Sequence, residues 1–317
     1  MFIIQNSMEV HEVLNTFKAK VHNLKTYDFS TLYTSIPHEK LKTRLLELIR
    51  KSFNSNDWKF IKIGKFKASW CNSIKFGLCF TCDDVINLMN WLIDNTYVTV
   101  GDKVFQQCVG IPMGTDCAPY LANLFLFSYE FEFMSKLRKE KKLLILRKFA
   151  KCFRYIDDLL TINNDNFMEK WKSKIYPKEL LLTSEDKDDQ SVDFLDLHIE
   201  IKNKNFTYRL HDKRDKFKFK VVNFPCLDGN IPTNQSYNVF FAQLIRYSRG
   251  CQNVLDFHNR TKILVSKLLK QHFNLVQLQR TYNRFLNKYS VLIGKYNTLL
   301  KKKLTDIASI HELEISD

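Results

Sequence analysis

The sequence is short of glycine and proline, with 8 and 6 among 317 residues, and it has no internal repeat. Flexible linkers are rich in glycine, serine or proline, so we expect none here. No apolar run approaches the ~20 residues that a membrane-spanning helix needs. The first residues lack a basic segment followed by an apolar one, so no secretory signal is expected. Membrane and secreted proteins are therefore disfavoured.

Cysteine is present but follows no disulfide framework. Eight cysteines are scattered along the chain, which favours free thiols in a reducing compartment. Cys79 and Cys82 form a CxxC pair near Cys71 that resembles half of a zinc site, but no fourth ligand lies nearby, so we expect no zinc there. These features predict an intracellular chain, nuclear or cytoplasmic, without a membrane partner.

Acidic residues are scarce: 34 Asp and Glu stand against 49 Lys and Arg, for a net charge of +15. The imbalance is strongest over residues 257–303, which hold eleven Lys or Arg and no acid. Solvated helical faces usually mix both signs, so this run favours contact with phosphate groups. A basic globular chain most often binds nucleic acid.

The spacing of apolar residues differs between the first and the last part of the chain. Alternating apolar patterns are interspersed with amphipathic helices up to about residue 210, which predicts an α+β part. From Ser236 onward the apolar residues repeat at helical spacing, which predicts an all-helical part. The boundary is expected near residue 230.

Adjacent carboxylates stand between two apolar runs in YIDD, which predicts a hairpin carrying Asp157 and Asp158. In LKTYDFSTLYTSIP, Asp28 ends another predicted strand just before a turn. If these strands pair, three carboxylates meet and repel one another unless divalent cations neutralise them, and such oxygen-rich sites suit Mg²⁺. Two such ions stabilise the attacking and leaving oxygens of phosphoryl transfer. The alternative is a polar hairpin turn and an aspartate that caps a helix.

Four motifs occur in a fixed order over about 170 residues: DFSTLY, GIPMGTDCAPYLANLF, YIDD and FLDLHI. Together they resemble the palm motifs of reverse transcriptases, most of all those of Penelope-like retroelements, with group II intron and telomerase enzymes as more distant relatives. The resemblance implies a right-hand palm, an antiparallel sheet backed by helices, with a C-terminal helical thumb. It assigns residues 1–229 to the palm with partial fingers, and residues 230–317 to the thumb and a short acidic tail.

The resemblance implies an RNA-directed DNA polymerase with two Mg²⁺ ions. Asp28 and Asp157 would ligate both ions, Asp158 would support the second, and the Phe29 carbonyl would complete one coordination shell. The metals would activate a primer 3′-hydroxyl and carry the charge that builds on the phosphate of a dNTP. Tyr33 matches the bulky residue that blocks a ribose 2′-hydroxyl. The alternative for Tyr33 is a tyrosine of the core.

The GIPMG motif would form the wall around the incoming nucleotide. Gly114 would let the backbone approach the base and template because it has no Cβ. Met113, Ala118 and Pro119 would shape the same wall. Many relatives have glutamine where this chain has Met113, a departure that leaves the metal site untouched but bears on nucleotide handling.

Basic residues have implied roles farther along the chain. Lys202 and Lys204 are candidates for the general acid that protonates pyrophosphate. Tyr282 and Tyr289 share an apolar stripe, so we expect them in the core. An RNA template, a DNA primer and their hybrid would be held through phosphates by six residues of the thumb, Lys262, Lys267, Lys270, Arg280, Arg284 and Lys288.

Only 27 residues precede Asp28, so the finger strands that hold the triphosphate are expected to be truncated. Lys18, Lys20 and Lys25 occur there, on what resembles a helix entering the palm. An upstream or partner chain would then supply the fingers. A catalytically weak nucleic-acid-binding remnant, or a fragment of a split polymerase, is therefore the alternative function. An RNA-templated RNA polymerase is disfavoured by Tyr33.

Overall fold

The computed structural model describes residues 2–17, 19–55, 57–74, 77–184, 188–219, 221–294, 296 and 304. Lys18 and the acidic tail lie outside these ranges. The chain divides into two compact units: unit 1 consists of Met1–Ile3 and Thr26–Glu185, and unit 2 of Ile4–Lys25 and Asp186–Asp317. Over the described ranges, none of the helices has the length and apolar character required to cross a membrane.

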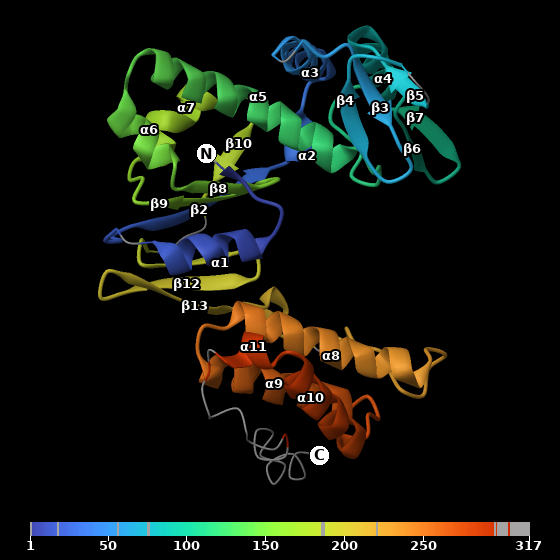
Figure 1. Ribbon diagram of the computed structural model, residues 1–317, viewed down its shortest axis with the longest axis vertical. Helices are drawn as coiled ribbons and strands as arrows, with labels where there is room; N and C mark the ends of the chain where they lie inside the picture. Colours follow the sequence, from blue (N-terminus) through green and yellow to red (C-terminus); the bar gives the residue numbers. More distant parts are fainter. Residues whose placement is uncertain are drawn as a thin grey trace. The chain divides into compact units, whose positions relative to one another are not determined.

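A five-stranded sheet carries the centre of unit 1 (Figure 1). In spatial order its strands are β1 (Phe2–Ile3), β8 (Cys152–Tyr155), β9 (Asp158–Ile162), β2 (Leu24–Ser30) and β10 (Leu181–Thr183). β8 pairs antiparallel with β9, β2 pairs antiparallel with β10, and β1 joins β8 in parallel. Strands remote in the sequence therefore become neighbours, with β2 between β9 and β10.

Helices cover this sheet and supply a large part of the core of unit 1. They are α5 (Ala118–Lys139), α6 (Leu143–Phe149), the π-helix η1 (Phe167–Lys172) and α7 (Ser173–Ile175), and Figure 1 shows α5, α6 and α7 grouped on one side of the sheet. Edge-to-face contacts join Phe133, Phe149 and Trp171. Large buried rings of this kind contribute strongly to core stability.

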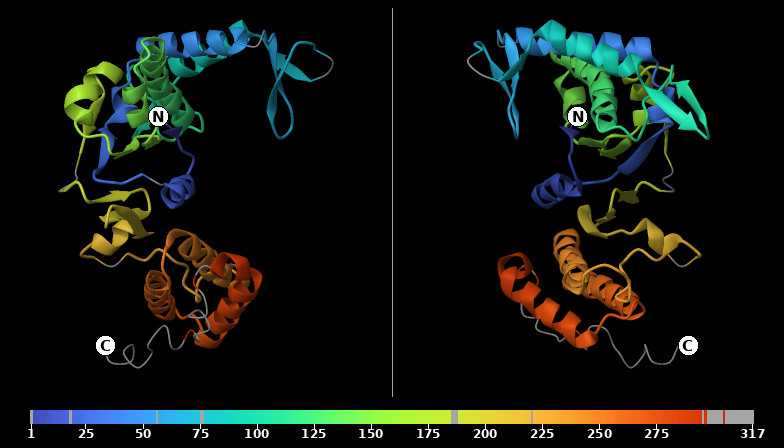
Figure 2. Two further views of the ribbon diagram at one scale, coloured as in Figure 1. Left: turned by 60° about the vertical axis from the view of Figure 1, so that its left-hand side comes forward. Right: turned by 90° about the vertical axis from the view of Figure 1, so that its right-hand side faces the viewer.

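The connection between β2 and α5 contains smaller elements. These are α2 (Leu32–Ser35), α3 (His38–Asn54), a sheet of β3 (Phe60–Ile63), β4 (Ala68–Cys71) and β5 (Leu78–Phe80), α4 (Cys82–Asp94), and a hairpin of β6 (Tyr97–Val100) and β7 (Lys103–Gln106). Figure 2 shows the three-stranded sheet beyond the C-terminal end of α3, away from the five-stranded sheet. Thr81 and Asp84 form a capping box that begins α4.

Unit 2 combines a helical bundle with an antiparallel sheet. Its elements are α1 (Ser7–Thr16), β11 (Ser191–Phe194), β12 (Leu197–Lys202), β13 (Asn205–Leu210), the 3-10 helix η2 (Lys213–Lys216), α8 (Thr233–Gly250), α9 (Val254–Leu269), α10 (Leu275–Lys288) and α11 (Ser290–Ile293). The bundle core includes Phe240, Phe257, Tyr282 and Phe285, all fully buried.

The division at residues 185 and 186 differs from the boundary expected near residue 230. The strands β11–β13 join the helical unit because their side chains pack against it. Leu210 of β13 lies so close to Gly250 of α8 that a Cβ there would overlap the leucine side chain. Tyr208 donates a hydrogen bond to Asn15 of α1 at 2.8 Å. These contacts link residues far apart in the sequence, which composition and periodicity do not reveal.

Candidate active site

The YIDD sequence forms the predicted hairpin. Tyr155 pairs with Asp158, which leaves Ile156 and Asp157 as a two-residue turn between β8 and β9. Ile156 has φ +51°. A positive φ at the first turn residue and not at the second is the mark of a type II′ turn, in which glycine usually takes the first position. A β-branched side chain is rare in this conformation, so the surrounding structure must hold the turn in place.

Arg154, two residues before the turn on strand β8, supplies that support. Its Nη1 donates to the carbonyl of Ile156 at 2.9 Å and to Oδ1 of Asn123 at 2.7 Å. Its Nε and Nη2 donate to the two carboxylate oxygens of Glu130 at 2.6 and 3.1 Å. The Arg154 side chain is 0% exposed and that of Glu130 is 4% exposed. The hairpin therefore rests on a buried, bidentate ion pair between β8 and α5.

The electrostatics of this pair are set by burial and by charge. Burial by itself lowers the pKa of Arg154, but the adjacent Glu130 carboxylate outweighs burial and leaves that pKa raised. Tyr176 also donates to Glu130, at 2.9 Å. Burial and then Glu130 raise the pKa of Tyr176 well above its usual range. The guanidinium of Arg154 therefore stays charged, and the hydroxyl of Tyr176 keeps its proton. Both groups can thus donate hydrogen bonds to the Glu130 carboxylate.

Strand β2 brings the third aspartate to the hairpin. The amide of Phe29 donates to the carbonyl of Asp157 at 3.1 Å. In a β-strand the N–H and C=O of one residue face the same neighbouring strand, so the Phe29 carbonyl also faces the hairpin. Phe29 is buried, and Asp28 before it points to the opposite side, half-buried. The structure thus places Asp28 beside Asp157 and Asp158 through the backbone.

The carboxylates themselves are not drawn into a tight cluster. In the part of the chain that the structure describes, the three aspartates are not among the groups whose possible ligand atoms all lie within 4.8 Å of one another. All three side chains are half-buried. Oxygen donors at one strand end and one hairpin tip fit the hard, oxygen-preferring Mg²⁺, and like charges have reason to stay apart without a cation.

Tyr33 lies next to this set, in the single turn α2. Its side chain is half-buried and packs on the core of unit 1. Burial first, and then the Asp157 carboxylate, raise the pKa of its hydroxyl. Tyr33 is thus close enough to Asp157 to feel its charge, while part of its ring belongs to the core. The packing of the ring agrees in part with the core alternative, and the role of Tyr33 in sugar selection stays a prediction.

Gly110 is a site residue that the sequence reasoning missed. It has φ +85°, and a Cβ there would overlap the carbonyl oxygen of Tyr33 and lie 2.9 Å from Cα of Thr34. The amide of Ile111 donates to that same Tyr33 carbonyl at 2.6 Å. Only glycine permits this approach. Gly110, the first glycine of GIPMG, therefore connects the motif to the turn after Asp28. Its position as the first residue of the motif is the sequence feature that could have predicted this role.

The predicted nucleotide wall has both exposed and buried parts. Gly114 has no atom within 4 Å of the position that a Cβ would take, and Met113 is 69% exposed. Ala118 is fully buried and Pro119 is half-buried, both in the first turn of α5. Met113 and Gly114 are thus available to a ligand, whereas Ala118 supports the wall from within the core.

The predicted basic residues of unit 2 occupy several surfaces. Lys202 is the last residue of β12, and Lys204 lies in the turn between β12 and β13. Lys202 pairs with Glu200 at 2.7 Å, which helps lower the pKa of Glu200 to about 2. Of the earlier lysines, Lys25 pairs with Asp189 at 3.2 Å. The general-acid role of Lys202 or Lys204 stays a prediction.

Helix α10 separates its charged face from its apolar face. Arg280, Arg284 and Lys288 recur every four residues and are exposed. Tyr282 is fully buried and Tyr289 packs on the core of unit 2, so their prediction as core residues is confirmed. Arg284 also stacks over Phe241 at 4.6 Å, which holds its guanidinium at the surface.

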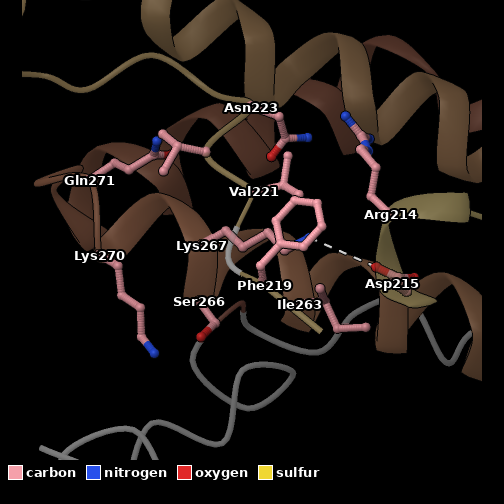
Figure 3. A pocket seen from close by; sticks show the side chains of 11 residues that line it. Arg214, Asp215, Phe219, Val221, Asn223, Ile263, Ser266, Lys267, Lys270 and Gln271 are labelled. Carbon is pink, nitrogen blue, oxygen red and sulfur yellow. Dashed lines mark ion pairs between the residues drawn. The ribbon is translucent and has the colours of Figure 1, made fainter. Parts of the chain in front are cut away.

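On α9 and just after it, Lys267 and Lys270 line a pocket of about 530 Å³ (Figure 3). Phe219, Val221 and Ile263 contribute apolar lining. Lys267 lies 3.8 Å from Asp215, and Figure 3 shows Lys270 extending outward. Lys262, also on α9, is half-buried. The predicted cations thus lie on α9, at its C-terminal end and on α10, all in unit 2.

Comparisons with known proteins bear on the fold. No protein-family model and no curated protein matches the chain. Among solved structures, telomerase from Candida albicans in complex with a TWJ fragment of telomeric RNA is similar over 97% of this chain, with a TM-score of 0.51 and 11% identity. Apo telomerase from Candida tropicalis is similar over 98%, with a TM-score of 0.45 and 13% identity. The chain spans about half of those chains, 50% and 54%. The predicted fold class is confirmed: the chain has a mixed α+β fold similar to that of the Candida albicans telomerase chain, which is a right-hand polymerase fold.

Proposed function

We propose that the chain is the reverse transcriptase of a Penelope-like retroelement, an RNA-directed DNA polymerase that extends a primer 3′-hydroxyl with dNTPs. The observation that carries the proposal is the hydrogen bond from Phe29 to Asp157, which brings the strand of Asp28 against the hairpin of Asp157 and Asp158. Three carboxylates at one place in a reverse-transcriptase-like fold match the chemistry of nucleotidyl transfer.

The acidic residues have separate tasks in this proposal. Asp28 and Asp157 hold two Mg²⁺ ions between them, Asp158 supports one ion, and the Phe29 carbonyl, which faces the hairpin, adds an oxygen ligand. When bound, the ions stabilise the charge that develops on the attacking and leaving oxygens. The protein's own contribution is to fix these oxygens before substrate arrives. Arg154 and Glu130 do so through the turn that they support.

The residues around the carboxylates select and orient the nucleotide. Tyr33 stands beside Asp157, where a ring under the sugar leaves no space for a 2′-hydroxyl. Gly110 anchors the GIPMG segment to the Tyr33 backbone, so that a shift of one moves the other. Met113 and Gly114 present the exposed part of the wall to the base.

Nucleic acid is the expected macromolecular partner. The exposed cations of α10, together with Lys270, can neutralise phosphates without reading sequence. The Candida albicans telomerase was solved with a fragment of telomeric RNA, which supports an RNA partner for a chain of this fold. We propose an RNA template and a DNA primer, whose hybrid is recognised by shape and backbone.

The experiment is primer extension on an RNA template with dNTPs and Mg²⁺. Asp157→Asn keeps the shape of the side chain and removes its charge, so extension should fall by at least about 100-fold, as for the loss of other electrostatic catalytic groups. Asp102→Asn is the matched control, because Asp102 also lies in a two-residue hairpin turn and is exposed. Extension by Asp157→Asn at the rate of the control would refute the two-metal assignment.

A nucleic-acid-binding remnant or a fragment of a split polymerase is the second candidate. The exposed cations of α10 support it as well, because they can bind phosphates without any metal site. The same assay separates the two functions when dNTP is titrated. The remnant binds primer–template and extends it weakly at any dNTP concentration. A polymerase instead gains rate as the dNTP concentration rises, until its nucleotide site is saturated.

A further inference from the structure

Three different metal-binding side chains meet in unit 2, far along the sequence from the aspartates. A sulfur of Cys226, a carboxylate oxygen of Asp228 and a ring nitrogen of His272 all lie within 4.8 Å of one another. Each residue is exposed. Across the described ranges of the chain, this is the one group of three or more such side chains whose donor atoms come that close.

Backbone hydrogen bonds bring the two parts of this cluster together. The amide of Leu227 donates to the carbonyl of Gln271 at 3.1 Å, and Nε2 of Gln271 donates to the carbonyl of Phe224 at 2.7 Å. The amide of Gly229 closes a turn on the carbonyl of Cys226 at 3.1 Å. These hydrogen bonds hold the segment before α8 against the connection between α9 and α10. They therefore bring Cys226 and Asp228 close to His272.

His272 occupies a backbone position that usually belongs to glycine. Its amide donates to Leu269 and that of Phe273 donates to Leu268, which together form the Schellman motif that ends α9. His272 is the left-handed residue of that motif, with φ +67°. Non-glycine residues held in this conformation concentrate at ligand sites. From here the ring places Nε2 3.4 Å from Oδ2 of Asp228.

The 3.4 Å between these two atoms matches the distance between two ligand atoms of one metal ion. With zinc–nitrogen and zinc–oxygen bonds of about 2.0–2.2 Å, tetrahedral geometry separates two ligand atoms by about 3.4 Å. The Cys226 sulfur lies within 4.8 Å of both other donors, so it has to move inward by no more than roughly 1 Å to reach the same sphere, which an exposed side chain achieves by rotation. Thiolate and imidazole donors favour zinc over magnesium or calcium.

We propose that Cys226, Asp228 and His272 bind one Zn²⁺ ion, with water as the fourth ligand. The ion joins the segment before α8 to the turn after α9. Gln271, next to His272, lines the pocket of Figure 3, so the ion also fixes one wall of that pocket. This site is separate from the aspartates and does not depend on the proposed polymerase function.

Cobalt is the probe, because a thiolate–Co²⁺ bond gives a charge-transfer absorption. The full chain, stripped of metal by a chelator, should bind one Co²⁺ with this absorption, and Zn²⁺ should displace it. Cys226→Ser should abolish the absorption, whereas Cys108→Ser, which removes another exposed thiol, should retain it. His272→Asn should weaken binding more than about 100-fold, the upper loss seen for residues that only support a ligand. Asparagine tolerates the left-handed conformation, so the turn is preserved.

Two further measurements complete the test. Zn²⁺ should protect Cys226 from iodoacetamide while Cys108 in the same molecule stays reactive. Zn²⁺ in excess should also raise the unfolding temperature of the native chain and not of His272→Asn, because a ligand that binds only the folded state stabilises it. Absence of saturable Co²⁺ binding would overturn the proposal. So would an absorption that persists in Cys226→Ser, since the thiolate would then belong to another cysteine.

Discussion

The buried pair of Arg154 and Glu130 offers the sharpest test of how the hairpin is held. Arg154→Met keeps the apolar stem of the side chain and removes the guanidinium. Glu130, 4% exposed, would then keep Tyr176 as a donor but lose both bonds from the arginine. Removal of one partner from a buried ion pair costs about 3–5 kcal/mol, since the other charge is left uncompensated. We expect a loss of this size in the free energy of unfolding.

The double variant Arg154→Met with Glu130→Leu separates the charge from the neutral hydrogen bonds. No buried charge remains, but the Ile156 carbonyl, the Asn123 side chain and the Tyr176 hydroxyl each lose a partner. A buried polar group left unpaired costs about 1–3 kcal/mol. The double variant should therefore lose clearly less stability than the two single variants added together, with a coupling of a few kcal/mol, as found for residues of one network.

Urea unfolding followed by tryptophan fluorescence measures this loss in the right part of the molecule. All four tryptophans, at positions 58, 70, 91 and 171, lie in unit 1, so the signal reports on that unit alone. Primer extension by the double variant should stay low despite its regained stability, because the Ile156 carbonyl has no donor. A loss below about 1 kcal/mol for Arg154→Met, typical of an exposed pair, would refute the reasoning. So would strict additivity of the two changes.

Three other predictions concern the nucleotide and the nucleic acid. Tyr33→Ala should admit ribonucleotides, with discrimination reduced by about 1–3 kcal/mol, as for other small steric differences in a pocket; unchanged dNTP preference would assign Tyr33 to the core alone. Gly110→Ala should destabilise unit 1 more than Gly101→Ala. Both glycines have positive φ, but only at position 110 would the added Cβ overlap other atoms. Equal losses of stability for the two variants in urea unfolding would contradict the close approach of the backbone at Gly110. Replacement of the exposed cations of α10 by glutamine should make the affinity for nucleic acid less sensitive to salt. The slope of log affinity against log salt concentration should fall by roughly 0.7–0.9 for each phosphate that is no longer neutralised. An unchanged slope would show that α10 is not part of the interface. These cations are Arg280, Arg284 and Lys288.

Part of the candidate site could be predicted from local sequence. Short apolar runs on both sides of YIDD indicated a hairpin, and the structure has it with the expected turn. Asp28 was predicted at a strand end, and β2 ends two residues after it, at Ser30. Such patterns are local, because a short strand and its turn each depend on only a few neighbouring residues. The roles of these aspartates in metal binding remain predictions.

Other parts depend on contacts across the chain. Arg154 stands three residues before the first of the paired aspartates and resembles any charged residue at a strand end. It is buried because Glu130, 24 residues earlier on α5, faces it inside the fold. Gly110 is required because the turn at Tyr33 passes over it, 77 residues away in the sequence. The free-energy cost of burying a charge or adding a Cβ depends on the residues that surround it in the fold, and the local sequence does not show which residues these are.

The sequence by itself determined the local elements, their approximate order and the family of motifs that they carry, since hydrophobic period and turn chemistry act over a few residues. Tertiary structure alone decided that β2 lies between β9 and β10, that β11–β13 pack with the helices of unit 2, and that Cys226 meets His272. These pairings close loops of tens to more than a hundred residues. Their selection rests on the summed burial and hydrogen bonding of whole surfaces, which no short segment encodes.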